Sequence, residues 1–148
     1  MTVSENLHVA LSLSANLEAN RTRNEDAFSW FPNLREKAAR RAGLLSGGER
    51  QMLALSMVLI QRPNVLLLDE PAEGLAKDLA FSVMEQVHEY VRENDATALV
   101  VEHNTTLILK FCTTIHFMSQ GHIHTSLQSS DPDVEEVLTD LYFNAGHQ

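Results

Sequence analysis

The chain is poor in cysteine, in basic residues and in long apolar runs. Cys112 is the only cysteine among 148 residues, so no disulfide forms within the chain, and a reducing cytoplasm is the expected compartment. There are 11 basic residues against 20 acidic ones, and the net charge of −9 argues against general nucleic-acid binding. No apolar run approaches the ~18 residues of a transmembrane helix, so we expect no insertion into a membrane.

The charges are unevenly distributed along the sequence. The acidic excess lies after residue 50, whereas most of the basic residues lie within residues 1–50. These basic residues are Arg21, Arg23, Arg35, Lys37, Arg40, Arg41 and Arg50. Such a group is either a solvated helical surface or a docking surface for a partner or an anionic ligand.

The first 42 residues have a helical pattern. Thr2 and Glu5 have the spacing of a capping box, which marks the start of a helix. The residues that follow at helical spacing are Leu7, Ala10, Leu11, Ser14 and Leu17. A short basic helix is predicted over Leu34–Arg41. We therefore assign residues 1–42 to a helical subdomain and residues 43–148 to an α/β part.

The α/β part begins with a second capping box, formed by Ser46 and Glu49, and a mostly buried helix follows it. Residues 65–68 and 98–101 are aliphatic runs that predict strands buried on both faces, and an amphipathic helix separates them. This order predicts parallel strands joined by a right-handed crossover. The remaining predicted elements are a hairpin over 114–118 and 122–126 and a last helix over 131–142.

Ser46, Gly47, Gly48 and Glu49 form a candidate anion-binding turn at the start of that buried helix. Adjacent glycines let a ligand approach the backbone, and the first-turn N–H groups together with the helix dipole attract an anion. The Ser46 hydroxyl can add a hydrogen bond to a phosphate. The same pattern is also typical of an ordinary capped helix, and both interpretations stay open.

Asp69 and Glu70 directly follow the strand 65–68. The carboxyl ends of parallel strands are where α/β sheets bind ligands, and two carboxylates there are costly unless a site uses them. Asp69 suits a Mg²⁺ ion held through water, and Glu70 suits the orientation or deprotonation of an attacking water. His103 follows the next strand at the same predicted edge, where it can contact a phosphate.

These motifs resemble those of the ATP-binding cassette (ABC) ATPases. Leu45–Gln51 (LSGGERQ) is similar to the family's signature motif, and Val65–Pro71 (VLLLDEP) is similar to its Walker B motif. Ala72–Ala76 falls where the D-loop follows, and His103 falls at the switch histidine. Flanking residues such as Trp30–Arg35 resemble the ATPase subunits of branched-chain amino-acid importers.

The resemblance implies an α/β fold with an incomplete P-loop NTPase-like core and a helical signature subdomain. It implies ATP and Mg²⁺ as cofactors, with Ser46, Gly47, Gly48 and Glu49 on the nucleotide and Asp69 on the metal. Glu70 and His103 are then the catalytic residues.

A P-loop, G-x-x-x-x-G-K-[ST], does not occur in these 148 residues. Gly43 and Gly48 have the required separation, but Glu49 and Arg50 stand where Lys and Ser or Thr are required. In the family the P-loop half precedes the signature motif, so the resemblance implies the C-terminal portion of an ABC ATPase. We expect this portion to bind Mg-ATP very weakly and not to hydrolyse it alone.

The missing P-loop strand also has a structural implication. In the family that strand belongs to the same sheet as 65–68 and 98–101, so its absence exposes an apolar edge, which proteins usually cover. We therefore expect a homodimer that pairs or swaps across this edge, with a rearranged monomer as the alternative.

Two other interpretations stay open. The chain is a non-catalytic binding or regulatory module for a full-length ABC ATPase or a membrane permease, or it is one lobe of a split ABC-type ATPase head. Under the transporter interpretations it is cytoplasmic and lies peripheral to the inner membrane when assembled with a permease. Sequence motifs of this kind do not specify the transported solute.

Overall fold

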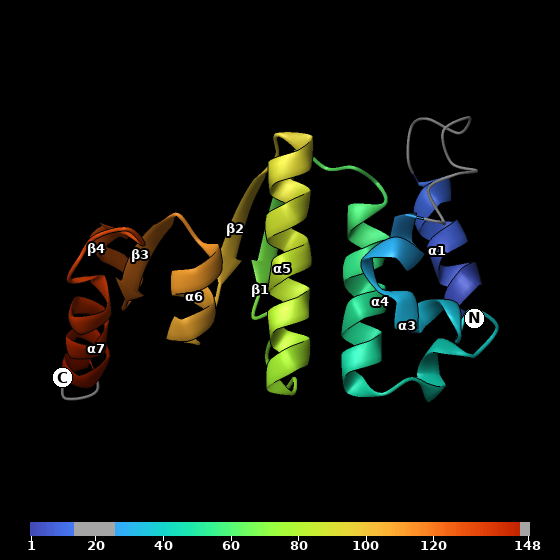
Figure 1. Ribbon diagram of the computed structural model, residues 1–148, viewed down its shortest axis with the longest axis horizontal. Helices are drawn as coiled ribbons and strands as arrows, with labels where there is room; N and C mark the ends of the chain where they lie inside the picture. The colour runs from blue at the N-terminus through green and yellow to red at the C-terminus, as the bar shows by residue number, and fades with distance from the viewer. Residues whose placement is uncertain (14–25, 146–148) are drawn as a thin grey trace. The chain divides into compact units, whose positions relative to one another are not determined.

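The computed structural model describes residues 1–13 and 26–145, and these residues form a mixed helix and strand protein (Figure 1). The chain divides into two compact units, Met1–Val101 and Glu102–Gln148. The boundary suggested by the sequence near residue 42 falls inside the first unit, because α1 and α3 from the first 42 residues pack against α4.

Helix α1 spans Val3–Ser12 and begins with the predicted capping box. The Thr2 N–H donates to Glu5 Oε2 at 2.7 Å, and the Glu5 N–H donates to Thr2 Oγ1 at 3.2 Å. These bonds satisfy backbone donors that have no partner within the helix. The predicted positions Ser14 and Leu17 lie outside the described residues.

The predicted helix over Leu34–Arg41 is wrong in extent. Helix α3 spans only Pro32–Arg35, and the residues after it form turns. The carbonyl groups of Ala38 and Arg40 each accept a backbone N–H from the first turn of α1 at 3.0 Å. Because these carbonyls are bonded to another helix, the segment does not continue the α-helical hydrogen-bond pattern. A short 3₁₀ helix, η1 (Ala42–Leu44), connects it to α4.

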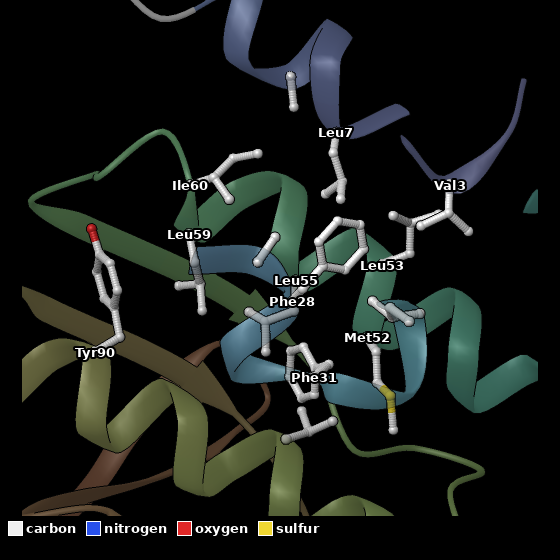
Figure 2. Close-up of a cluster of buried hydrophobic side chains, with 14 of the residues drawn as sticks. Val3, Leu7, Phe28, Phe31, Met52, Leu53, Leu55, Leu59, Ile60 and Tyr90 are labelled. Atoms are coloured by element: carbon white, nitrogen blue, oxygen red, sulfur yellow. The ribbon is translucent and has the colours of Figure 1, made fainter. Parts of the chain in front are cut away.

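Helix α4 (Gly47–Leu59) leads to the βαβ unit of strand β1 (Val65–Asp69), helix α5 (Lys77–Asn94) and strand β2 (Thr97–Val101). The strands are parallel, as the strand–helix–strand order predicts. In their register, Val65 lies opposite Thr97 and Asp69 lies opposite Val101. The core of the first compact unit, Met1–Val101, consists of side chains from α1, α4, α5 and the segment 27–34 (Figure 2). The core residues labelled there are Val3, Leu7, Phe28, Phe31, Met52, Leu53, Leu55, Leu59, Ile60 and Tyr90.

The expectation that both strands are buried on both faces is wrong. Leu66 is 1% exposed and packs into the core, whereas its neighbour Leu67 is 75% exposed. The exposed face of the sheet, named here the open face, consists of Val65, Leu67, Leu99 and Val101, each more than half exposed. Successive side chains of a strand point to opposite faces of the sheet. In the described residues, side chains of α4 and α5 pack against one face only.

The second unit contains helix α6 (Thr105–Phe111), strands β3 (Thr114–Ser119) and β4 (His122–Gln128), and helix α7 (Val134–Ala145). The antiparallel pairing of β3 with β4 confirms the predicted hairpin. A small cluster of Ile108, Ile115, Val134 and Leu138 packs α6 and α7 around it. Asn104 caps α6, since its Oδ1 accepts the N–H groups of Thr106 and Leu107.

Candidate functional site

The signature-like residues form the first turn of α4. Ser46 is the N-cap: its Oγ accepts the Glu49 N–H at 3.2 Å, and its own N–H donates to Glu49 Oε2 at 2.9 Å. The structure therefore confirms the predicted capping box. Because the Ser46 Oγ accepts this bond, the hydroxyl hydrogen is left available for donation to a ligand.

The Glu49 carboxylate is also bonded to Lys37, which lies twelve residues earlier in the chain. Lys37 Nζ donates to Glu49 Oε1 at 2.5 Å, and the two side chains are 27% and 20% exposed. The hydrogen bond from Lys37, followed by the one from the Ser46 N–H, lowers the pKa of Glu49 below its ordinary value. No sequence pattern connects these two residues, because no periodic spacing joins a turn residue to a helix start.

The two glycines of the motif differ in their surroundings. A Cβ at Gly47 would meet no atom within 4 Å, whereas a Cβ at Gly48 would lie 2.2 Å from Leu79 Cδ2. Gly48 therefore permits the close approach of α4 to α5, and Gly47 leaves open backbone at the helix start. The predicted ligand access fits Gly47, and Gly48 has a packing role that the sequence did not reveal.

Asp69 and Glu70 lie at the carboxyl end of β1. Asp69 is exposed and ends the strand, and the Glu70 N–H continues the ladder by donating to the Val101 carbonyl at 2.9 Å. Glu70 has φ +47°, a left-handed conformation that is uncommon for a residue other than glycine. The Glu73 N–H donates to the Glu70 carbonyl at 3.1 Å and closes the turn that holds this conformation.

One side-chain hydrogen bond joins α4, the helix that begins with the signature-like residues, to the turn Glu70–Glu73 after β1, called here the Walker B-like turn. Gln51 Nε2, in the second turn of α4, donates to the Pro71 carbonyl at 3.0 Å. The two motifs lie twenty residues apart in sequence, and this bond fixes one against the other. Gln51 belongs to the quoted LSGGERQ motif, but no sequence pattern indicated the carbonyl that it contacts.

His103 lies in the second unit, just before α6. Its N–H donates to Glu102 Oε1 at 2.9 Å, its Nδ1 lies 3.6 Å from the same oxygen, and its side chain is 64% exposed. The structure describes His103 within its own unit, so its predicted place beside Asp69 and Glu70 stays a prediction.

The donor set at the end of β1 can be compared with what a metal ion needs. Within residues 1–13 and 26–145, no three acidic, histidine or cysteine side chains gather as a metal cluster. Mg²⁺ is usually held by one or two carboxylates together with water and substrate phosphates, so the exposed Asp69 carboxylate fits a Mg²⁺ ion that arrives with a nucleotide. It does not fit a metal held by protein ligands alone.

The family model for ABC transporters matches residues 1–73, which include the signature-like helix and the Walker B-like strand. The probable branched-chain amino-acid transport ATP-binding protein LivF of Archaeoglobus fulgidus is 35% identical over 83% of this chain and 52% of its own length. The corresponding high-affinity protein BraG of Pseudomonas aeruginosa is 34% identical over the same shares. A phosphonates import ATP-binding protein of Stutzerimonas stutzeri is 35% identical over 74% of this chain. The chain spans about half the length of the LivF and BraG relatives.

Solved structures agree on the fold. A nucleotide-free ATP-binding cassette from an ABC transporter superposes with a TM-score of 0.74 at 24% identity, over 96% of this chain and 62% of that one. A dimeric cassette in a post-hydrolysis state, bound to ADP and Pi, superposes with a TM-score of 0.76 at 21% identity. It covers 88% of this chain and 58% of that one.

Fold and motifs together define an ATP-binding cassette type of protein with an incomplete core. Residues 1–73 belong to the ABC transporter family, and the chain is similar to ATP-binding proteins of that family over most of its length. In the part of the chain that the structure describes, no helix is both long enough and apolar enough to cross a membrane.

The different surroundings of the two glycines yield a stability prediction. Gly48→Ala should lower the free energy of unfolding by up to about 1 kcal/mol more than Gly47→Ala does, because only the Cβ at position 48 overlaps Leu79, whose side-chain end must then shift. Both positions lie in the first turn of α4, so differences in helix propensity largely cancel. Urea unfolding measures the two values. In a Leu79→Ala background the excess cost of Gly48→Ala should disappear, and an undiminished cost there would contradict the packing role.

Proposed function

We propose that these 148 residues supply the signature and Walker B side of an ABC-type ATPase similar to those of branched-chain amino-acid importers. The observation that carries the proposal is the hydrogen bond from Gln51 to the Pro71 carbonyl, which holds the two motifs in one unit. The 34–35% identity to LivF and BraG supports the importer type, although phosphonate importers match at similar identity over a smaller share of the chain.

The signature turn, Ser46–Glu49 at the start of α4, would contact the phosphates of a nucleotide. Ser46 donates its hydroxyl, and the N–H groups of Gly47 and Gly48 lie in the first turn of α4, where the helix dipole favours an anion. Glu49 keeps its carboxylate turned back onto the Ser46 N–H and Lys37. Its contribution is therefore to the shape of the turn.

The Walker B-like turn would act on the other side of the nucleotide. Asp69 would hold Mg²⁺ through water, and the ion would neutralise charge on the phosphates. Glu70 would orient or deprotonate the attacking water, and His103 would contact the terminal phosphate.

An ABC-type ATPase needs a P-loop to bind the phosphates of ATP, and these 148 residues do not contain one. We therefore propose that the 148-residue polypeptide does not hold or hydrolyse Mg-ATP by itself. It would complete a nucleotide site together with a cassette that carries a P-loop, and it would lie on the cytoplasmic side of a membrane wherever that cassette is bound to a permease.

The sequence predicts a homodimer across the sheet edge, and we propose that the second copy covers the open face as well. Val65, Leu67, Leu99 and Val101 form a contiguous apolar surface on a two-stranded parallel sheet, and such sheets are normally covered on both faces.

The proposed homodimer predicts a change in mass on substitution of the open face. Leu67→Asp should convert a dimer into a monomer, because a carboxylate in an apolar contact is costly to desolvate. Light scattering of the 148-residue chain measures the mass, and Asp26→Asn, which removes a partly exposed carboxylate from the same unit, is the control. A wild-type chain that is monomeric at 100 µM, well above the concentration that about 1 µM affinity requires, would refute the homodimer.

The function itself is tested by nucleotide-dependent capture. Immobilised BraG of Pseudomonas aeruginosa, a full-length relative, is exposed to the 148-residue chain with Mg-ATP and without it. We expect capture to require Mg-ATP. Ser46→Asp should weaken it at least about tenfold, because aspartate caps a helix as well as serine does but repels phosphate.

The matched control is Thr2→Asp, the same type of replacement at the N-cap of α1. It should leave capture unchanged. Capture that does not depend on Mg-ATP, or that Ser46→Asp does not weaken, would point to a regulatory module that binds through another surface. Either result, or no capture at all, would overturn the proposed function.

A further inference from the structure

The Lys37–Glu49 ion pair connects the signature turn to a segment that the proposed function leaves without a role. Lys37 lies in the turns after α3, and Glu49 lies in the first turn of α4. Both side chains are partly buried, at 27% and 20% exposure, and their charged atoms are 2.5 Å apart. A surface pair in water contributes little, but a shielded pair with direct hydrogen bonding contributes more.

The backbone around Lys37 is itself held in place. Its N–H donates to the Leu34 carbonyl at 3.1 Å, and its carbonyl accepts the Arg40 N–H at 2.8 Å. The next carbonyls, those of Ala38 and Arg40, accept N–H groups from the start of α1. The Lys37 ammonium is therefore presented to Glu49 from a turn that two helices fix.

Glu49 poses an electrostatic problem for a phosphate-binding turn. Its carboxylate lies in the same first turn of α4 that would receive the phosphates. Negative charges within one helical turn repel each other. The guanidinium of Arg50, the next residue, donates to the Leu45 carbonyl at 2.6 Å. Among the residues that the structure describes, Lys37 is the cation placed on this carboxylate.

We infer that Lys37 is a positioning residue of the signature turn: its ammonium holds the Glu49 carboxylate against the Ser46 N–H and cancels its charge, so that the turn attracts phosphate. The inference rests on the proposed function, because it assigns Lys37, in the turns after α3, a role in that same site. The lowered pKa of Glu49 is consistent with the contact.

The test removes the charge at position 37 with and without a charge at position 49. Lys37→Met should weaken Mg-ATP-dependent capture by BraG about tenfold, and Lys37→Arg should restore it to near the wild-type value. In a Glu49→Gln background, where glutamine preserves the capping box, Lys37→Met should change capture less than about twofold. Arg62→Met, which breaks the more exposed pair with Asp26, is the charge-matched control and should have no effect.

A second readout does not involve the nucleotide. Carbon-detected NMR titration of Glu49 in the 148-residue chain should show its pKa rising toward the ordinary value in Lys37→Met and staying low in Lys37→Arg. If Lys37→Met does not fold, Lys37→Gln, which is uncharged but keeps a donor, makes the same comparison.

The outcomes separate the inference from the proposed function. If wild-type capture occurs but Lys37→Met weakens it equally in both backgrounds, Lys37 is only structural and the inference fails alone. An unchanged Glu49 pKa in Lys37→Met also overturns the inference alone. If the wild-type chain is not captured with Mg-ATP, the proposed function fails, and the inference fails with it.

Discussion

The packing of α4 is the constraint on which the first unit depends. This helix contacts α1 and α3 on one side and α5 on another, and its buried side chains supply much of the core. Gly48 permits the close contact with α5, and the Gln51 side chain reaches the Pro71 carbonyl only because α4 lies against the βαβ unit. The placement of the signature turn beside the Walker B-like turn therefore follows from apolar burial and one polar contact.

The sequence predicted the elements whose signals are local. Both capping boxes, the βαβ order and the hairpin are confirmed, because a cap, a hydrophobic period and a turn depend on neighbouring residues. The predicted helix over Leu34–Arg41 is wrong because the carbonyls of Ala38 and Arg40 bond to α1, a distant segment. Aliphatic runs in β1 and β2 suggested burial on both faces, but a sequence does not state which layers are present to cover a sheet.

The candidate site shows the same division. Ser46, Gly47, Gly48, Glu49, Asp69 and Glu70 were identifiable from motif and position, and the structure places them at a helix start and a strand end as predicted. The tertiary contacts that hold them, Lys37 to Glu49 and Gln51 to Pro71, have no sequence signature because they join residues from different elements. The roles of Glu70 and His103 remain proposals. Under the proposed function the two turns would supply groups for phosphate, metal and water, whereas a P-loop supplies the principal phosphate contacts in a complete cassette.

We propose that this chain presents one side of a nucleotide site without the phosphate-binding loop. Isothermal titration calorimetry of Mg-ATP into the purified 148-residue chain tests it most directly. The account predicts a dissociation constant of about 1 mM or weaker, as expected where a helix start and one carboxylate are the main contacts. A dissociation constant near 1 µM, which requires about 4 kcal/mol more binding free energy, would contradict it.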